Sequence, residues 1–216
     1  MKRVLFLLAC AAAVGSIYSQ DVSLPAPKDK VGLDLIDAIK ARSVSRSFTG
    51  QDIPLADLST ILWAGNGVRN APDVVSSASK AMRTIPYSGD NAYIDLYVLD
   101  AHGAYAYAPD RSLLKKVASR DVRDQITPEL IKGSSVMILF SYDGARVPAF
   151  LKGNPTMVRE MMNGTAGFAA ENIGLAASAF KVSTVTMYNL KSGIPALLGF
   201  GKEEAPLFIM QLGYAP

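Results

Sequence analysis

The chain has 216 residues, of which 50% are hydrophobic and 19% are charged, and its formal net charge is +3. This composition is typical of one folded domain and argues against a disordered or fibrous protein. Basic and acidic residues are nearly balanced and no basic run stands out, so we expect no nucleic-acid partner. His102 and Cys10 are the only residues of their types, so we expect neither a metal site nor a disulfide framework.

Residues 1–19 are typical of a secretory signal peptide. Lys2 and Arg3 precede an uncharged apolar stretch that is too short to span a bilayer. We therefore expect cleavage after Ser19, export to the periplasm or the medium, and no transmembrane segment. Cys10 leaves an alternative open, because the residues before it resemble a lipoprotein cleavage box that would lead to a lipid anchor.

The first half of the mature chain is predicted to begin with a tether and two helices. Residues 20–32 hold two prolines and show little periodicity, so we interpret them as a tether ahead of a domain over 33–216. Apolar residues at helical spacing predict a helix over 34–41 and another after Pro54. The stretch 65–92 is rich in Gly, Asn, Ser, Asp and Pro, which predicts a long loop.

The second half is predicted to contain both strands and helices. Apolar and alternating runs predict strands at Tyr93–Leu99, Ala104–Tyr107, Ser135–Tyr142, Val182–Met187 and Leu207–Leu212. We expect short helices near 112–119 and 127–132, and one long helix over 155–180. These elements predict an α+β fold, with a sheet of about four or five strands covered by helices.

The sequence contains no clear acid–base–nucleophile arrangement. His102 precedes Gly103 at a predicted hairpin tip, which favours a solvent-exposed turn residue over a catalytic base. Asp121, Arg123 and Asp124 are interpreted as a solvated face with local ion pairs. If the protein is an enzyme, its reactive chemistry therefore belongs to a cofactor.

The most informative segment is Arg42–Phe48, with the sequence RSVSRSF. Two guanidinium groups four residues apart can converge on one phosphate, and the hydroxyl groups between them can add hydrogen bonds. Taken alone, such a cluster also fits a surface ion-pair site. The segment by itself leaves both interpretations open.

Six segments carry motifs in a fixed order: Arg42–Phe48, Leu58–Gly67, Arg83–Asn91, Ala104–Leu113, Ala166–Leu175 and Leu212–Pro216. In this order they resemble the nitroreductase family of FMN-dependent flavoenzymes. The resemblance covers nearly all of residues 34–216. It is closest to the branch akin to the dehydrogenases of thiazole and oxazole peptide biosynthesis, whose LSxLLWAxxG helix is similar to LSTILWAGNG in this chain.

The resemblance implies an α+β homodimer with a mostly antiparallel central sheet and an FMN in each of two clefts at the subunit interface. Arg42, Ser43 and Arg46 are implied to hold the phosphate and ribityl chain of the flavin. The residues implied to line the flavin ring are Pro86, Tyr87, Ser88 and Asp90 or Asn91, and the stretch from Thr186 through Met187 to Tyr188 is implied to approach the ring by its backbone. The implied mechanism is ping-pong hydride transfer from a small-molecule donor through FMN to an acceptor such as a nitroaromatic or a quinone, without a covalent side-chain catalyst.

Some positions depart from the family pattern. Tyr87 stands where the family has a serine, Asp90 where it has an asparagine, and Glu171 where it has a glutamine. An aspartate accepts hydrogen bonds but does not donate them at neutral pH. The basic residues that often follow the terminal motif are missing after Pro216. Two alternatives therefore stay open, a catalytically silent flavin- or ligand-binding module on the same fold and an azoline dehydrogenase that acts on a modified peptide.

Overall fold

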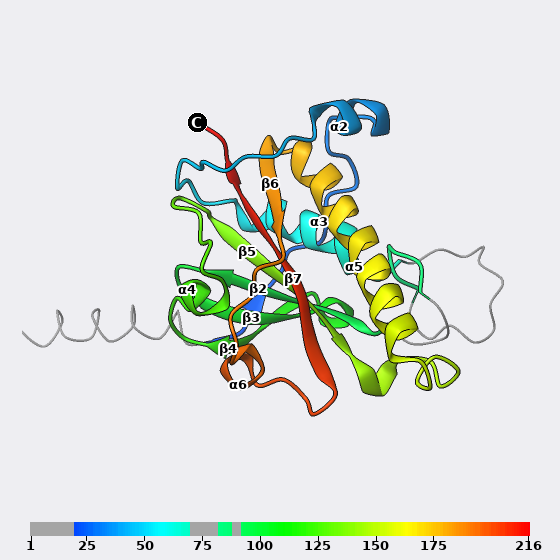
Figure 1. Ribbon diagram of the computed structural model, residues 1–216. Coiled ribbons are helices and arrows are strands. Elements are labelled where there is room, and N and C mark those ends of the chain that lie inside the picture. The colour runs from blue at the N-terminus through cyan, green and yellow to red at the C-terminus, as the bar shows by residue number, and fades with distance from the viewer. Residues whose placement is uncertain (1–19, 70–81, 88–91) are drawn as a thin grey trace, which may run out of the picture.

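The protein is described by a computed structural model that covers residues 20–69, 82–87 and 92–216 (Figure 1). Within these residues, one sheet of seven strands runs in the order β1-β4-β3-β2-β5-β7-β6, and all neighbouring strands are antiparallel. The strands are β1 (Val22–Ser23), β2 (Ile94–Asp100), β3 (Gly103–Ala108), β4 (Leu113–Ala118), β5 (Val136–Asp143), β6 (Val182–Met187) and β7 (Glu204–Tyr214). The α+β fold with a mostly antiparallel sheet is confirmed.

Helices cover both faces of the sheet. They are α2 (Leu35–Ala41), α3 (Leu55–Asn66), α4 (Arg123–Ile126), α5 (Pro155–Ser178) and α6 (Ile194–Leu198), with 3-10 turns at Pro109–Arg111 and Gly144–Arg146. One core joins α3 and α5 to the alternate strand residues Ile94, Leu96, Ile138 and Phe140. The second joins α4 and α6 to Leu99, Met137 and Leu139 on the opposite face. The near-continuous apolar run of β5 follows from this, because both of its faces are covered.

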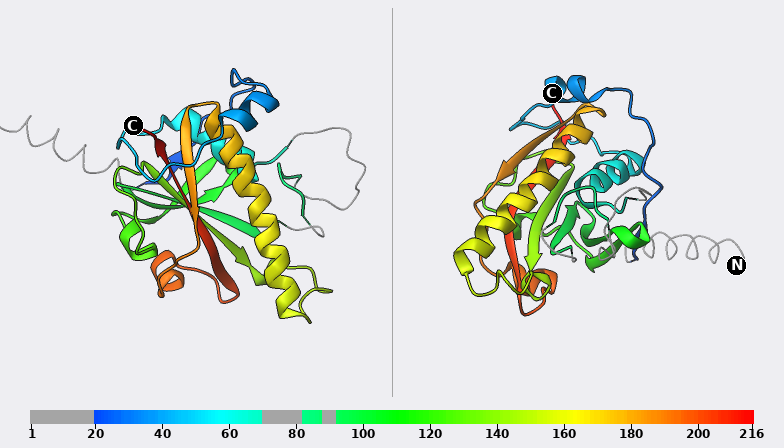
Figure 2. Two further views of the ribbon diagram at one scale, coloured as in Figure 1. Left: turned by 45° about the horizontal axis from the view of Figure 1, so that its top comes forward. Right: turned by 90° about the vertical axis from the view of Figure 1, so that its right-hand side faces the viewer.

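The long helix α5 packs closely against α3 and beside β6 (Figures 1 and 2). The side chain of Asn154 accepts a hydrogen bond from the Met157 backbone, which caps the start of α5. A Cβ at Gly65 of α3 would overlap the Ile173 side chain of α5, so the glycine lets the two helices approach closely. The amide of Asn172 donates to the Ala64 carbonyl at 3.1 Å and fixes the same contact.

Two expected helices are wrong. The segment predicted as a helix near 112–119 is strand β4, which pairs with β3 on one side and with β1 on the other. Residues 127–132 contain no helix, and the short helix α4 lies before them. The Leu- and Lys-rich sequence of 113–118 suits a helix, but pairing with β3 overrides that local preference. The described sheet is therefore larger than the expected four or five strands.

The segment interpreted as a tether packs onto the domain through several contacts. Val22 and Ser23 form β1 at the edge of the sheet. The backbone N–H of Lys28 donates to the Thr60 hydroxyl of α3 at 3.0 Å. No helix of the described segments is long and apolar enough to cross a membrane.

Arg123 is not part of a solvated face, as the sequence suggested. Its guanidinium group is buried, binds the Asp121 carboxylate and donates to the Ser134 carbonyl at 2.7 Å. Burial opposes ionisation of Asp121, but the hydrogen bonds from Arg123 hold the pKa of this carboxyl below its usual value. The buried charge is thus compensated locally, and the pair ties α4 to the start of β5.

The segment between α2 and α3 is attached to the edge of the sheet formed by β6 and β7. The Thr184 backbone N–H donates to the Ser43 carbonyl at 3.2 Å, and Val44 forms a parallel bridge with Thr184. Further along, Thr49 N–H donates to the Tyr214 carbonyl at 2.9 Å. Gly133 supports this attachment, because its φ is +80° and a Cβ there would overlap the carbonyl of Phe48.

We expect Gly133→Ala to destabilise the protein by about 2 to 4 kcal/mol, because it adds an overlap with Phe48 to an unfavourable backbone angle. Gly193→Ala is the matched control, since Gly193 also has a positive φ, +89°, but has open space around its Cβ position. It should cost about 1 kcal/mol. Urea unfolding of both variants measures the difference, and equal losses would show that the contact with Phe48 contributes nothing.

Candidate functional site

A groove lies between the exposed side of α5 and the strands β6 and β7. Its first part, which we call the arginine cavity, has a volume of about 380 Å³, within the range of small-molecule sites. It is lined by Arg42, Val44, Arg46, Gly167, Ala170, Glu171, Gly174, Thr184, Val185, Thr186, Tyr188, Phe208 and Met210. The two arginines that the sequence singled out therefore meet in one cavity.

The arginine cavity has an excess of positive charge. Arg42 Nε lies 3.4 Å from the Glu171 carboxylate, and the stem of Arg42 packs over Gly174. Arg46 has no ion pair with any carboxylate in the described part of the chain. Two guanidinium groups against one carboxylate leave a net cation, which favours an anionic ligand group such as a phosphate.

The side chains of Ser43 and Met187 do not line the arginine cavity. Ser43 was expected at the flavin phosphate, whereas Met187 was expected to approach the ring by its backbone, and its neighbours Thr186 and Tyr188 both line the cavity. The hydroxyls of Ser43 and Ser183 are hydrogen-bonded at 2.7 Å, so the Ser43 side chain is directed to β6. The sulfur of Met187 lies 3.1 Å from Gln211 Nε2, within the second core. Alternation along β6 explains this, because Thr184, Thr186 and Tyr188 share the face that borders the groove.

Pro86 and Tyr87 also lie outside the arginine cavity. The Tyr87 hydroxyl donates to Asn66 Oδ1 at 2.9 Å, and its ring meets Tyr93 edge-on at 4.8 Å. Burial of this hydroxyl raises the pKa of Tyr87 well above its usual value. The other residues expected at the ring, Ser88, Asp90 and Asn91, lie outside the described residues. A single chain thus does not bring the Pro86–Tyr87 pair to the two arginines.

The groove continues past Tyr188 into a second cavity, which we call the distal cavity. Its volume is about 510 Å³, and it is lined by Tyr142, Pro155, Arg159, Asn163, Gly167, Tyr188, Ala205, Pro206, Leu207 and Phe208. Gly167, Tyr188 and Phe208 border both cavities, so the two form one groove. The Tyr188 side chain is 72% exposed and leans against Phe208, with 5.4 Å between the ring centroids. Sequence reasoning missed the distal cavity, because its walls come from α5 and β7, which are distant in sequence.

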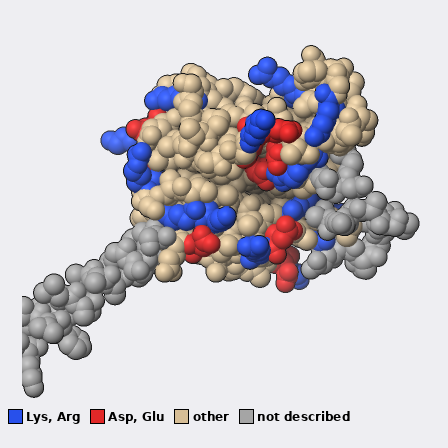
Figure 3. Space-filling view, turned by 90° about the horizontal axis from the view of Figure 1, so that it is seen from below, with Lys and Arg blue, Asp and Glu red and all other residues tan. Residues whose placement is uncertain are grey.

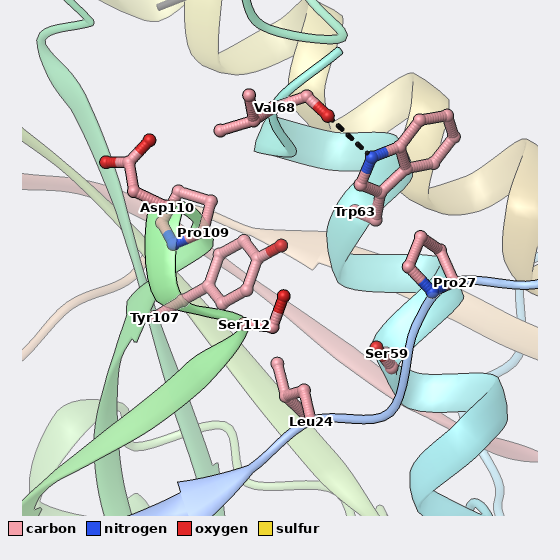
Figure 4. Close-up of a pocket in the computed structure, with 9 residues that line it drawn as sticks. All are labelled: Leu24, Pro27, Ser59, Trp63, Val68, Tyr107, Pro109, Asp110 and Ser112. Atoms are coloured by element: carbon pink, nitrogen blue, oxygen red, sulfur yellow. Dashed lines mark hydrogen bonds between the residues drawn. The ribbon is translucent and has the colours of Figure 1, made fainter. Parts of the chain in front are cut away.

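A third cavity of about 370 Å³ lies where the N-terminal segment crosses α3 and the turn between β3 and β4 (Figure 4). The Trp63 indole donates to the Val68 carbonyl at its rim. Asp110, the charged side chain among its described lining residues, is already paired with Arg83 at 3.3 Å. None of its described lining residues is a cation that could bind a phosphate, so the groove along α5 is the better candidate. Figure 3 shows a face where basic and acidic side chains are interspersed, without a uniformly basic surface.

The described residues thus form an α+β domain with a cationic groove along α5. A family model for the nitroreductase family matches residues 39–214, so the chain belongs to the nitroreductase family. This confirms the resemblance drawn from the sequence motifs. No curated protein matches the chain.

Three solved structures show the same fold. A candidate nitroreductase from Ralstonia eutropha JMP134 has 24% identity and a TM-score of 0.75, with 93% of this chain and 92% of that chain covered. A chain of the Escherichia coli microcin synthetase complex McbBCD has 14% identity and a TM-score of 0.63, with 90% and 77% covered. This neighbour is consistent with the family branch indicated by the motifs. A candidate nitroreductase from Desulfovibrio desulfuricans, solved in complex with FMN, has 18% identity and a TM-score of 0.54, with 84% and 86% covered.

We expect Tyr87→Phe to lower the free energy of unfolding by about 1 to 2 kcal/mol, because it leaves the buried Asn66 Oδ1 without its hydrogen-bond donor. Tyr188→Phe removes the same atom from an exposed ring and should change stability by less than about 0.5 kcal/mol. Chemical denaturation of the two variants measures both values. If Tyr87→Phe were as stable as Tyr188→Phe, the structural role of Tyr87 would be wrong.

Proposed function

We propose that the protein is an FMN-dependent oxidoreductase whose flavin lies along the arginine cavity. The observation that carries this proposal is that Arg42 and Arg46 line one cavity beside β6, in a chain of the nitroreductase family. The Desulfovibrio desulfuricans neighbour supports it, since that protein was solved with FMN.

The residues present fit this cofactor. The cationic end of the cavity, at Arg42 and Arg46, suits a phosphate monoester. From Thr184 to Tyr188 the chain advances by about 13 Å at the usual rise of a strand. Tyr188 and Phe208 then supply aromatic surface at the other end. This spacing matches a ligand whose phosphate and planar ring lie at opposite ends.

When bound, FMN would supply the redox chemistry, by taking a hydride from a donor and passing two electrons to an acceptor such as a nitroaromatic or a quinone. The chain's own part is to bind and orient. Arg42 and Arg46 hold the anionic end, and Glu171 keeps Arg42 directed along α5. Tyr188 and Phe208 shield the ring end from solvent. The physiological donor and acceptor are small molecules.

We propose further that the protein is a homodimer. The side chains of Leu35, Ile36 and Ile39 on α2 are 65%, 57% and 51% exposed, and Phe168 on α5 is 52% exposed. Such a set of exposed apolar residues is typical of an interface. A second copy would also resolve the separation of Pro86 and Tyr87 from the arginines, because the partner could bring this pair to the flavin.

Export through residues 1–19 is part of the same proposal. It rests on the charged start and the short apolar stretch of the sequence. Identifying the mature N-terminus distinguishes the two forms of export. Gln20 would indicate soluble export, and a lipidated Cys10 would indicate a lipid anchor.

We expect Arg42→Ala and Arg46→Ala each to weaken FMN binding by about 1.5 to 3 kcal/mol, or about 10- to 100-fold in Kd, through loss of a charge-assisted hydrogen bond. Arg120→Ala, an exposed arginine outside the groove, is the control and should bind FMN as wild type does. Fluorescence titration with FMN measures all three. Equal Kd values would contradict the placement of the phosphate. A protein that binds FMN but is reduced by no donor would be the catalytically silent module.

We expect Ile36→Asp combined with Ile39→Asp to convert the dimer into a monomer, because two charges would be buried in the interface. Size-exclusion chromatography with light scattering gives the mass of each form. Lys132→Asp places an acidic residue on an exposed loop and should remain dimeric. A wild-type protein that is monomeric while it holds FMN would overturn the dimer proposal.

A further inference from the structure

The distal cavity contains an unpaired cation. Arg159 is the charged side chain among its described lining residues. It forms no ion pair with a carboxylate of residues 20–69, 82–87 or 92–216. Asn163 and Gly167 follow at intervals of four, so the three residues share one face of α5. This face therefore presents a guanidinium group, an amide and an open position to the cavity.

The opposite wall of the distal cavity is apolar and aromatic. The start of β7 contributes Ala205, Pro206 and Leu207. Phe208 is held in place by stacking on Phe140, with 4.6 Å between the ring centroids and 28° between the planes. A fixed aromatic wall facing one cation suits a planar ring that carries one negative charge.

The distal cavity adjoins the cavity in which the flavin is proposed to lie. It adjoins the arginine cavity at Gly167, Tyr188 and Phe208, and Gly167 lies about two helical turns from Gly174, over which Arg42 packs. A Cβ at Gly167 would meet no atom within 4 Å, so the passage between the cavities is open on the side of α5. A compound in the distal cavity would thus lie next to the end where the proposed function places the flavin ring.

We propose that the distal cavity is the acceptor subsite and that Arg159 selects planar aromatic acceptors bearing a carboxylate. This inference rests on the proposed function for the identity of the reaction. The carboxylate binds the guanidinium fork of Arg159, and Asn163 donates a further hydrogen bond. The ring lies against Phe208 and Tyr188. Arg159 is a specificity-determining residue here and takes no part in electron transfer.

The test compares two acceptors of nearly equal shape, para-nitrobenzoate and the neutral para-nitrobenzamide. The full-length holoprotein is reduced with stoichiometric dithionite under anaerobic conditions, and stopped-flow absorbance follows flavin reoxidation by each compound. In Arg159→Met we expect the rate constant for the carboxylate to fall by roughly 10-fold relative to that for the amide. Taking the ratio between the compounds in each variant cancels their different intrinsic reactivity.

Two further variants separate charge at the site from general effects. Arg159→Lys keeps the charge but loses the fork, so it should retain part of the preference for the carboxylate. Arg120→Gln changes the net charge of the protein equally but lies outside both cavities, and it should behave as wild type. An equal change for both acceptors in Arg159→Met, or no change for either, would overturn the proposal.

A binding measurement separates this inference from the proposed function. Benzoate is titrated into the wild-type protein and into Arg159→Met, each as purified, and heat or amide chemical shifts report binding. Binding that weakens in Arg159→Met supports the carboxylate site even if the protein takes up no FMN, which would refute the proposed function alone. Binding that is absent, or unchanged by Arg159→Met, would overturn the carboxylate site even in an active flavoenzyme.

Discussion

The attachment of residues 43–50 to the edge of β6 and β7 is the constraint on which the candidate site depends. The chain leaves α2 and could run freely across the surface, but the hydrogen bond from Thr184 N–H to the Ser43 carbonyl holds its first part along β6. Phe48 holds the second part, since it packs where Gly133 and Gly213 leave room for it. Arg46 lies within this held segment and Arg42 directly precedes it at the C-cap of α2, so the sheet edge helps to place both arginines in the lining of one cavity.

The helix α5 supplies the core and the groove with different faces. Its inward face carries small and branched residues, among them Ala166, Ala169 and Ile173, which let it lie close to α3 and the sheet. Its groove face carries Arg159, Asn163, Gly167, Glu171 and Gly174 at helical spacing. Packing the inward face therefore sets the groove face opposite β6 and β7 without any loop.

The charges in the groove divide it into three parts. Arg42 and Arg46 make the arginine cavity cationic, and Arg159 makes the distal cavity cationic. Between them lie Tyr188 and Phe208, which are aromatic and uncharged. Anionic groups are thus favoured near the arginines and a planar ring between them. In the proposed function, this pattern suits a phosphate-bearing cofactor and a carboxylate-bearing acceptor that lie in one groove.

The sequence by itself determined the local elements and the family. Periodicity located the helices at 34–41 and after Pro54 and the five main strands, and the order of six motifs indicated the nitroreductase family that the family model confirms. These features are set by residues close together in the chain. The sequence also singled out Arg42 and Arg46, because two arginines four residues apart can bind one phosphate group.

Only the tertiary structure decided the features that depend on a distant partner. Residues 113–118 became β4 because β3 and β1 offered pairing that outweighed helix propensity. Ser43 was turned to Ser183 and Met187 into the core because the register of β6 against β7 assigns each side chain to one face. Tyr87 was placed against Asn66, away from the arginines. The direction of a side chain in a sheet follows from its neighbours across the strands, and no local pattern in this sequence contains that information.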